Sequence, residues 1–355
     1  MTGRESRTPW WRPDRFAGRR PTLQARAAIA AALRQWFAGQ GFIEVETPVL
    51  QVSPGLEPHI RPFVTQIEAP FDQGTRRMYL QSSPEYAMKK LLAAGETKIF
   101  QLARVFRNGE RGATHEPEFT MLEWYRAGAG WEQLGTDCEG ILRAALAAVD
   151  PGLSRGSLRW QDRAVDPAAA FERLSVAEAF SRHAGIDLLA TTPDPQRPDL
   201  GQLARRAAEI GIRTSPQDSW DDIVFRILLD RIEPHLGAAR PTLLHSWPAS
   251  MAALARLDPH DSRVAERCEL YVAGLELANG FGELTDAAEQ RRRFALEQAQ
   301  KRDLLGDDVP LDDDFLAALD HGLPPSAGMA MGFDRLVMLA TGATEIQQVL
   351  WAPVA

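Results

Sequence analysis

The sequence has few of the features that mark secreted, zinc-binding or membrane proteins. Only two of its 355 residues are cysteines, Cys138 and Cys268, and they lie far apart in the chain, which argues against a disulfide framework or a cysteine zinc site. No apolar run approaches the roughly 18 residues that a membrane span requires. The N-terminal residues also lack the apolar core of a signal peptide. These absences predict a cytoplasmic protein that does not span a membrane.

An excess of positive charge is also absent. Lys and Arg total 40 whereas Asp and Glu total 48, so the net charge is −8, which argues against broad non-specific binding to nucleic acid. A local basic patch remains compatible with this balance, because six arginines gather at the start of the chain: Arg4, Arg7, Arg12, Arg15, Arg19 and Arg20. With 45% apolar and 25% charged residues the chain is typical of globular proteins, and its length suffices for one large or two ordinary domains.

The pattern of elements predicts an α+β fold. Residues 1–21 are expected to form an arm, followed by a helix over 23–39 that Thr22 caps and a strand over 42–47 that Pro48 ends. Further helices are predicted over 82–92, 130–148, 176–183, 203–209, 220–236, 287–304, 312–321 and 334–340. Further strands are predicted over 78–81, 98–107, 119–125, 243–247, 268–277, 280–284 and 326–333. Because irregular spacers separate these strands, we expect a mostly antiparallel sheet with helices packed around it.

The first stretch with unusual chemistry is the predicted hairpin over 98–125. Alternation places four dissimilar side chains on one face of its second strand, namely Phe119, Met121, Glu123 and Tyr125. A plain core would avoid the carboxylate among them. Arg107, at the end of the first strand, supplies a guanidinium beside this face, so the hairpin is able to form the floor of an anion site. The alternative is a hairpin whose polar face is merely solvated.

The second stretch carries three carboxylates at seven-residue intervals, Glu269, Glu276 and Glu283, with Asn279-Gly280 as a turn signal. Carboxylates beside a phosphate-bearing ligand suit Mg²⁺, which takes one or two of them and completes its shell with phosphate oxygens and water. A carboxylate equally suits a substrate amine. The alternative is a solvated hairpin edge whose charges prevent aggregation.

The third stretch, residues 328–336, joins a strand rich in Gly, Ala and Met to a helix that Asp334 begins. Its small residues allow a ligand to approach the backbone closely. Arg335 would lie in the first helical turn, where the helix dipole disfavours a cation. That cost suggests a use, such as contact with a nucleotide, although an ordinary strand-to-helix joint with a solvated arginine is the alternative.

Together, and in this order, these stretches resemble the signature motifs of class II aminoacyl-tRNA synthetases. The helix ending in residues 41–48 resembles motif 1, residues 106–125 resemble motif 2, and residues 332–335 resemble motif 3. The detail is closest to lysyl-tRNA synthetase, but the catalytic pattern begins near residue 22 and leaves no room for the N-terminal anticodon-binding barrel of those enzymes. This short form resembles the elongation factor P–lysine ligase family over residues 22 to 350.

The resemblance implies a class II synthetase catalytic domain over residues 22–355, with a mixed, mostly antiparallel sheet flanked by helices and a variable helical segment over about 150–215. It implies a ligase that uses ATP, with Mg²⁺, to activate (R)-β-lysine or lysine as the adenylate. The enzyme would then transfer the aminoacyl group to a lysine side chain of elongation factor P through an amide bond. A homodimer is expected from motif 1, and tRNA is not expected as a partner. The alternatives are acylation of tRNA or a small molecule, and a non-catalytic sensor of lysine or nucleotide.

The resemblance also implies roles for individual residues. The catalytic cations would be Arg107, which contacts the α-phosphate and the substrate carboxylate, and Arg335, which sandwiches adenine against Phe119. The ATP site would contain Arg107, Asn108, Gly109, Glu110, His115, Glu116, Phe119, Glu276, Leu277, Gly332 and Arg335, with His115 at the β- and γ-phosphates. The amino-acid pocket would contain Ser83, Pro84, Glu85, Glu123, Tyr125, Asn279, Glu283 and Ala330. Glu269 and Glu276 would hold Mg²⁺.

Three positions depart from the synthetase pattern. Gly109 stands where the family usually has a glutamate that contacts adenine, with Glu110 next to it, and Glu116 stands where lysyl-tRNA synthetases have asparagine. A carboxylate at position 116 would be repelled by ATP unless a metal or an arginine is adjacent, and the role of Arg111 is open. Ala330 replaces a glycine, and its methyl group is expected to reshape the pocket away from α-lysine.

Overall fold

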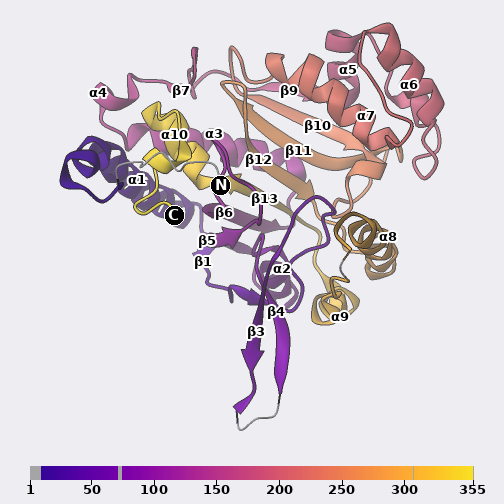
Figure 1. Cartoon of the computed structure of the whole chain (residues 1–355), viewed down its shortest axis with the longest axis horizontal. Helices are drawn as coiled ribbons and strands as arrows, with labels where there is room; N and C mark the ends of the chain where they lie inside the picture. Colours follow the sequence, from indigo (N-terminus) through magenta and orange to yellow (C-terminus); the bar gives the residue numbers. More distant parts are fainter. Residues whose placement is uncertain (1–8, 71–73, 307, 355) are drawn as a thin grey trace, which may run out of the picture.

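The computed structural model describes residues 9–354 except 71–73 and 307, so Arg4 and Arg7 of the predicted basic patch lie outside the described residues. Its centre is a mixed eight-stranded sheet (Figure 1). The strands, in spatial order, are β1 (Ile43–Glu44), β5 (Lys98–Phe106), β6 (Glu118–Ala127), β13 (Ser326–Gly332), β12 (Leu275–Gly282), β11 (Val264–Val272), β10 (Thr242–Pro248) and β9 (Glu172–Ser175). Only the β1–β5 and β9–β10 pairs are parallel among these described strands. The predicted fold class is confirmed.

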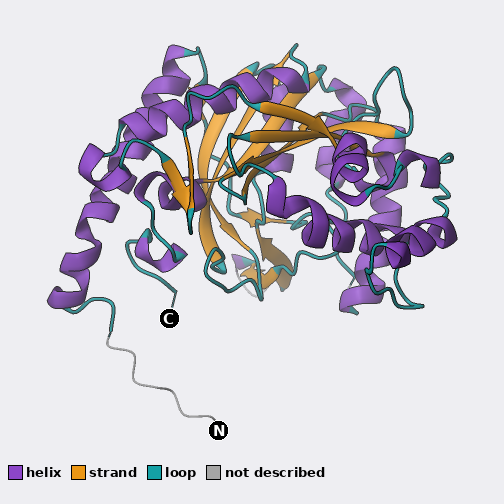
Figure 2. Ribbon diagram, turned by 90° about the horizontal axis from the view of Figure 1, so that it is seen from above, coloured by secondary structure: helices purple, strands orange, loops and turns teal. Residues whose placement is uncertain are grey.

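One face of the sheet packs on α1 (Pro13–Gly39), α3 (Trp131–Ala147) and α10 (Phe333–Thr341). Phe37 of α1 stacks on Phe100 with ring centroids 4.4 Å apart, and Trp124 of β6 is fully buried beside them. The alternate residues of β6 therefore point to the opposite face, as period-two alternation predicts. On that side Tyr125 joins an apolar cluster with α2 (Glu85–Ala93), α8 (Ala287–Leu305) and α9 (Asp313–Gly322). Figure 2 shows helices on both sides of the strands.

The remaining elements extend this core. A three-stranded sheet of β2 (Leu50–Gln51), β4 (Thr75–Leu80) and β3 (Phe63–Glu68) projects from the body in Figure 1. A helical layer at the β9 end of the main sheet has its own apolar cluster and packs on β10. Its helices are α5 (Val176–Ala184), α6 (Leu200–Glu209) and α7 (Trp220–Ile227). The shorter elements are α4 (Pro151–Ser154), β7 (Leu158–Trp160), β8 (Arg163–Val165), η2 (Leu189–Thr191), η3 (Leu228–Ile232), η4 (Glu233–His235), η5 (Ala249–Met251) and η6 (Ile346–Gln348).

Two helix boundaries differ from the sequence prediction. Helix α1 begins at Pro13, so residues 13–21, expected in the arm, and the expected cap Thr22 are helical. Proline is favourable in a first helical turn because its ring presets φ and its missing N–H is not needed there. The helix predicted over 220–236 is regular only to Ile227, and it continues as a π-helical turn and a short 3₁₀ turn that contains Pro234, a residue unable to donate a helical hydrogen bond.

The predicted turn at Asn279-Gly280 is wrong. The β11–β12 hairpin turns instead at Ala273-Gly274, where φ is +53° and +82°, as a two-residue hairpin turn requires. Asn279 and Gly280 continue as strand β12, paired with both neighbouring strands. Gly280 suits this interior position because a Cβ there would lie 2.8 Å from the carbonyl oxygen of Gly328.

No helix among the described residues combines the length and the apolar character that crossing a bilayer requires.

Candidate active site

A cavity of about 1100 Å³ opens beside β6, β12 and β13, on the side of the sheet away from α1. Thirteen predicted site residues line it: Ser83, Glu85, Arg107, Glu110, His115, Glu116, Phe119, Glu276, Leu277, Asn279, Ala330, Gly332 and Arg335. The described lining does not include Pro84, Asn108, Gly109, Glu123, Tyr125, Glu269 or Glu283. The structure thus brings residues from all three stretches of unusual chemistry, over 98–125, 269–284 and 328–336, to one cleft.

Strand β6 supplies the acidic end of the cleft with a buried carboxylate. Glu123 accepts hydrogen bonds from the Ser83 hydroxyl at 2.7 Å and from the Tyr125 hydroxyl at 2.5 Å. Burial, reinforced by the nearby Glu85 carboxylate, raises the pKa of Glu123 to about 8. A cation bound here would stabilise the ionised form of Glu123, so this position favours an ammonium group.

Ala330 lies between two polar residues of this pocket. In the sheet register it is directly opposite Glu123 on one neighbouring strand and Asn279 on the other. Directly opposed residues point to the same face of a sheet, so the Ala330 methyl group is placed between the carboxylate and the amide. The Asn279 Oδ1 atom is buried without a hydrogen-bond partner among the described residues, which leaves an acceptor for a ligand.

A buried lysine that the sequence analysis missed links two other predicted carboxylates. The Lys89 Nζ atom is 2.5 Å from Glu85 and 2.5 Å from Glu283. Burial raises the pKa of Glu283 to about 7, although the Lys89 ammonium opposes this shift. Gly328 leaves space for the Tyr125 ring and the Glu283 carboxylate, because a Cβ at position 328 would overlap the ring and lie 2.7 Å from Glu283 Oε1. Lys89 occurs at helical spacing after Glu85, which is the only sequence signal for the pair.

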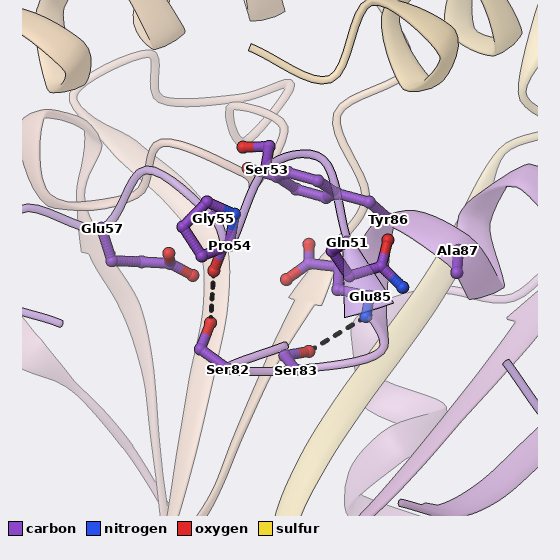
Figure 3. A pocket seen from close by; sticks show the side chains of 10 residues that line it. All are labelled: Gln51, Ser53, Pro54, Gly55, Glu57, Ser82, Ser83, Glu85, Tyr86 and Ala87. Carbon is purple, nitrogen blue, oxygen red and sulfur yellow. Dashed lines mark hydrogen bonds between the residues drawn. The ribbon is translucent and has the colours of Figure 1, made fainter. Parts of the chain in front are cut away.

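Glu57 is a second residue that the sequence analysis missed. Figure 3 shows the Glu57 carboxylate pointing toward that of Glu85. The loop that carries Glu57 is held by Ser82, whose hydroxyl donates a 2.6 Å hydrogen bond to the Pro54 carbonyl. Burial and the Glu85 carboxylate raise the pKa of Glu57. Glu57 also lines the large cleft. The loop that carries Glu57 has no hydrophobic periodicity, so its sequence does not predict that Glu57 lies at the cleft.

The other end of the cleft is cationic. The Arg107 guanidinium lies 5.4 Å from the centroid of the Phe119 ring, and its Nε atom is buried without a partner among the described residues. Arg335 donates to the Glu276 carbonyl at 2.8 Å and its Nη2 is 2.6 Å from His115 Nε2. The sandwich of adenine between Phe119 and Arg335 stays a prediction.

The contact with Arg335 defines the tautomer of His115. Because a guanidinium has only donors, His115 Nε2 must accept, which places the ring proton on Nδ1, where the Thr114 hydroxyl lies 3.2 Å away. Burial and the Arg335 charge lower the pKa of His115. The histidine is therefore neutral at physiological pH, with its orientation set by Arg335.

Backbone contacts and a left-handed glycine shape the loop that departs from the synthetase pattern. The Asn108 N–H donates to the Arg61 carbonyl at 2.8 Å, and Gly109 follows at φ +83°, a conformation that disfavours the glutamate expected there. Glu110 lines the cavity instead. Glu116 is buried, with Arg111 3.8 Å from its carboxylate. An arginine is thus adjacent to Glu116, as the sequence analysis required.

The candidate metal carboxylates lie close enough to interact. Glu276 lines the cavity, whereas Glu269 lies behind it, accepting from Arg267 at 2.7 Å and from the Tyr271 hydroxyl at 2.8 Å. Burial and the Glu276 carboxylate raise the pKa of Glu269 to about 7. No cluster of three or more metal-binding side chains occurs among the described residues, but Mg²⁺ bound through nucleotide phosphates needs only one or two carboxylates. The pair therefore fits such an ion.

A buried network joins the three segments that resemble motifs 1, 2 and 3, namely α1, β6 and the start of α10. Arg26 of α1 pairs with Asp334 at the start of α10 and donates to the Thr120 hydroxyl of β6 at 2.9 Å. The second Asp334 oxygen accepts from the Thr120 N–H at 2.7 Å. Asp334 thereby positions the helix that carries Arg335. Arg26 falls among alanines and apolar residues of its helix, where a charge is unexpected, and that exception is the signal that the sequence analysis did not use.

Comparison with known sequences shows the family of this chain. Residues 14–354 match the family described as tRNA synthetases class II (D, K and N). The chain is 40% identical over 347 residues to the elongation factor P–(R)-β-lysine ligase of Klebsiella pneumoniae subsp. pneumoniae, covering 97% of this chain and 98% of that protein. It is 39% identical over 349 residues to the protein of the same name from Pectobacterium carotovorum subsp. carotovorum, with the same coverage. The matched residues include the whole described cleft, so the chain belongs to the class II tRNA synthetase family.

Proposed function

We propose that the protein is an ATP-dependent ligase that activates (R)-β-lysine, or lysine, as the adenylate and transfers it to a lysine side chain of elongation factor P. The observation that carries this proposal is the division of one cleft into an acidic and a cationic end. Three carboxylates, Glu85, Glu123 and Glu283, gather at or directly behind one end. Arg107 and Arg335 occupy the other. A diamino acid with one carboxylate has the complementary charge distribution.

The first step forms the adenylate. The amino-acid carboxylate attacks the α-phosphorus of ATP, the bond to the bridging oxygen breaks, and pyrophosphate leaves. No protein nucleophile is required, because the chain contributes alignment and charge neutralisation. Arg107 would hold the two negatively charged reactants together, and Arg335 would bind the nucleotide beside neutral His115. Glu276, with Glu269 behind it, would hold Mg²⁺, which neutralises phosphate charge when bound.

The second step forms the amide. The neutral ε-amine of a lysine on elongation factor P attacks the adenylate carbonyl, AMP leaves, and the amine loses one proton to solvent or a nearby base. The ligase names of relatives 39–40% identical over 97% of the chain support this acceptor. Ala330 supports the preference for a β-amino acid, since its methyl group narrows the space between Glu123 and Asn279.

We also propose that the chain forms a homodimer in the cytoplasm. The edge strand β1 has only two residues and exposes Ile43, and three more exposed apolar side chains lie on the small sheet that follows it, at Leu50, Val64 and Ile67. Such side chains at a sheet edge favour burial against a second copy. Light scattering after size exclusion should give the mass of two chains, and a monomer would contradict this part of the proposal.

The function is tested in two assays. ATP–pyrophosphate exchange with (R)-β-lysine, α-lysine and norleucine, which lacks the second ammonium group, should show activity with the diamino acids alone. Transfer is then measured with elongation factor P and with lysine tRNA as acceptors. Absence of exchange with every amino acid would refute the enzyme, and transfer to tRNA but not to elongation factor P would refute the protein acceptor.

A further inference from the structure

Lys89 is a cation buried behind the acidic end of the cleft. It lies on α2, is 1% exposed, and pairs at 2.5 Å with both Glu85 and Glu283. The described lining of the cavity does not include it. Buried ion pairs seldom add stability over apolar packing, because both charges lose their water. Stability alone therefore does not explain why the pocket contains this lysine.

Once all three carboxyl groups around Lys89 are ionised, as binding of a diamino acid requires, the charges there leave an excess of two negative units. Glu85 of α2, Glu123 of β6 and Glu283 after β12 contribute three carboxylates, and Lys89 contributes one ammonium, so three minus one leaves two. Tyr125, which faces the same group from β6, is a neutral phenol whose pKa is raised by burial. Two negative units match the two ammonium groups of a diamino acid whose carboxylate is met elsewhere in the cleft.

The next charged groups outward are balanced separately. Arg256, whose charge acts on Glu283, is paired with Glu266 at 2.7 Å. Two buried carboxyls, Glu57 and Glu297, act on Glu85, and Lys301 lies near both. Burial raises the pKa of Glu297 to about 8, so Glu297 is mostly protonated at pH 7 and Lys301 offsets the charge of Glu57. These neighbours therefore leave the count at the pocket unchanged.

Two buried acceptor atoms show that the pocket is arranged for further donors. Asn279 Oδ1 and Glu283 Oε1 have no hydrogen-bond partner among the described residues. Glu283 is 1% exposed. Buried acceptors of this kind are normally satisfied, and ammonium groups, which have only donors, would satisfy them.

We propose that Lys89 is a positioning residue that sets the charge of the amino-acid pocket, holding Glu85 and Glu283 in place and leaving two negative charges for the two ammonium groups of the substrate. This inference rests on the proposed function and adds a specificity residue that does not touch the substrate. Without Lys89, three carboxylates would crowd together and retain an additional proton at neutral pH. A diamino acid would then have to displace that proton to bind.

The test compares pH profiles of pyrophosphate exchange in the full-length enzyme. Lys89→Met should raise KM for the diamino acid at pH 7 at least about tenfold and shift the acidic limb of kcat/KM upward by about one pH unit or more, with KM for ATP nearly unchanged. In the double variant Lys89→Met/Glu283→Gln the pocket again has a net charge of two negative units. The acidic limb of kcat/KM should therefore return to within about 0.3 pH units of its wild-type position, even if the maximum of kcat/KM is lower. Lys90→Met is the matched control, because Lys90 is the next residue of the same helix but pairs with Asp312 and Asp314 at the start of α9, not with a pocket carboxylate.

Each outcome decides the inference. A Lys89→Met profile that is lower at every pH but not displaced, or a double variant whose limb stays displaced, would refute the charge-setting role. If Lys89→Met does not fold, the double variant, which removes both members of the pair, still provides the test, and a displaced limb there refutes it. Wild-type exchange with no diamino acid would refute the proposed function instead, so the two failures are distinguishable.

Discussion

Binding of a diamino acid should tighten as pH rises, because Glu123 holds a proton in the free protein. The pKa of Glu123 is raised to about 8 by burial and by Glu85, so its carboxyl is mostly protonated at pH 7. An ammonium ligand needs the carboxylate, and the proton must leave when the ligand binds. The affinity is therefore lowest at acid pH and increases until pH passes the pKa of the free protein.

The magnitude follows from that pKa. Deprotonating Glu123 costs about 3 kcal/mol at pH 6, about 1 kcal/mol at pH 7 and well under 1 kcal/mol at pH 8. The affinity should thus increase by more than about tenfold from pH 6 to pH 8, and binding at pH 7 should release nearly one proton from this group. Glu283, with a pKa raised to about 7, steepens the dependence below neutrality.

Isothermal titration calorimetry with α-lysine and (R)-β-lysine, in pairs of buffers with different ionisation enthalpies, measures both quantities. Glu123→Gln should abolish the proton release that comes from Glu123 and make the affinity less dependent on pH. Glu118→Gln is the matched control, because Glu118 begins the same strand but faces the exposed Arg104 at 3.9 Å. An affinity that is constant from pH 6 to pH 8, with no proton released, would refute the buried-acid explanation.

Three further substitutions test the packing of the site. Gly328→Ala should impair lysine binding and destabilise the fold by about 1–3 kcal/mol, since the new methyl group overlaps the Tyr125 ring; equal Kd and Tm values for variant and wild type would contradict this. Ala330→Gly should raise pyrophosphate exchange with α-lysine relative to (R)-β-lysine, and an unchanged ratio would exclude Ala330 as a selector. Arg26→Met should lower the free energy of unfolding by about 3–5 kcal/mol in urea titrations, because Asp334 stays buried without its partner, whereas a loss below about 1 kcal/mol would show that the pair is weak.

The elements with strong periodicity were predicted from the sequence, and those defined by competing turns were not. Alternation correctly assigned the two faces of β6, because one face packs toward α1 and a one-residue shift would turn Leu122 and Trp124 toward the cleft. The β11–β12 turn was misplaced because Asn279-Gly280 is a stronger local turn signal than Ala273-Gly274. Only the pairing of β12 with β13 on its other side shows that the strand must continue through Asn279.

The buried cations escaped prediction for a different reason. Lys89 follows the helical period like a surface residue, and Arg26 is marked only by the apolar residues around it; neither pattern shows which distant segment covers the charge. Their partners lie on distant segments, at Glu283 and Asp334. A charge on an otherwise apolar helix face is visible in a sequence, but its partner is defined only by the tertiary fold.

The separation of charge in the cleft explains how one pocket can both select the amino acid and align it. In the proposed function, Glu123 and its neighbours would attract the ammonium groups, while Arg107 and Arg335 would attract the carboxylate and the nucleotide. A substrate bound in the reverse direction would put its carboxylate among buried acids and lose both sets of contacts. Arg335 holds its own position by donating to the Glu276 carbonyl and to neutral His115, so it keeps its positive charge for the nucleotide. Orientation of the substrate, which the adenylation step requires, therefore follows from the same charges that exclude a neutral amino acid.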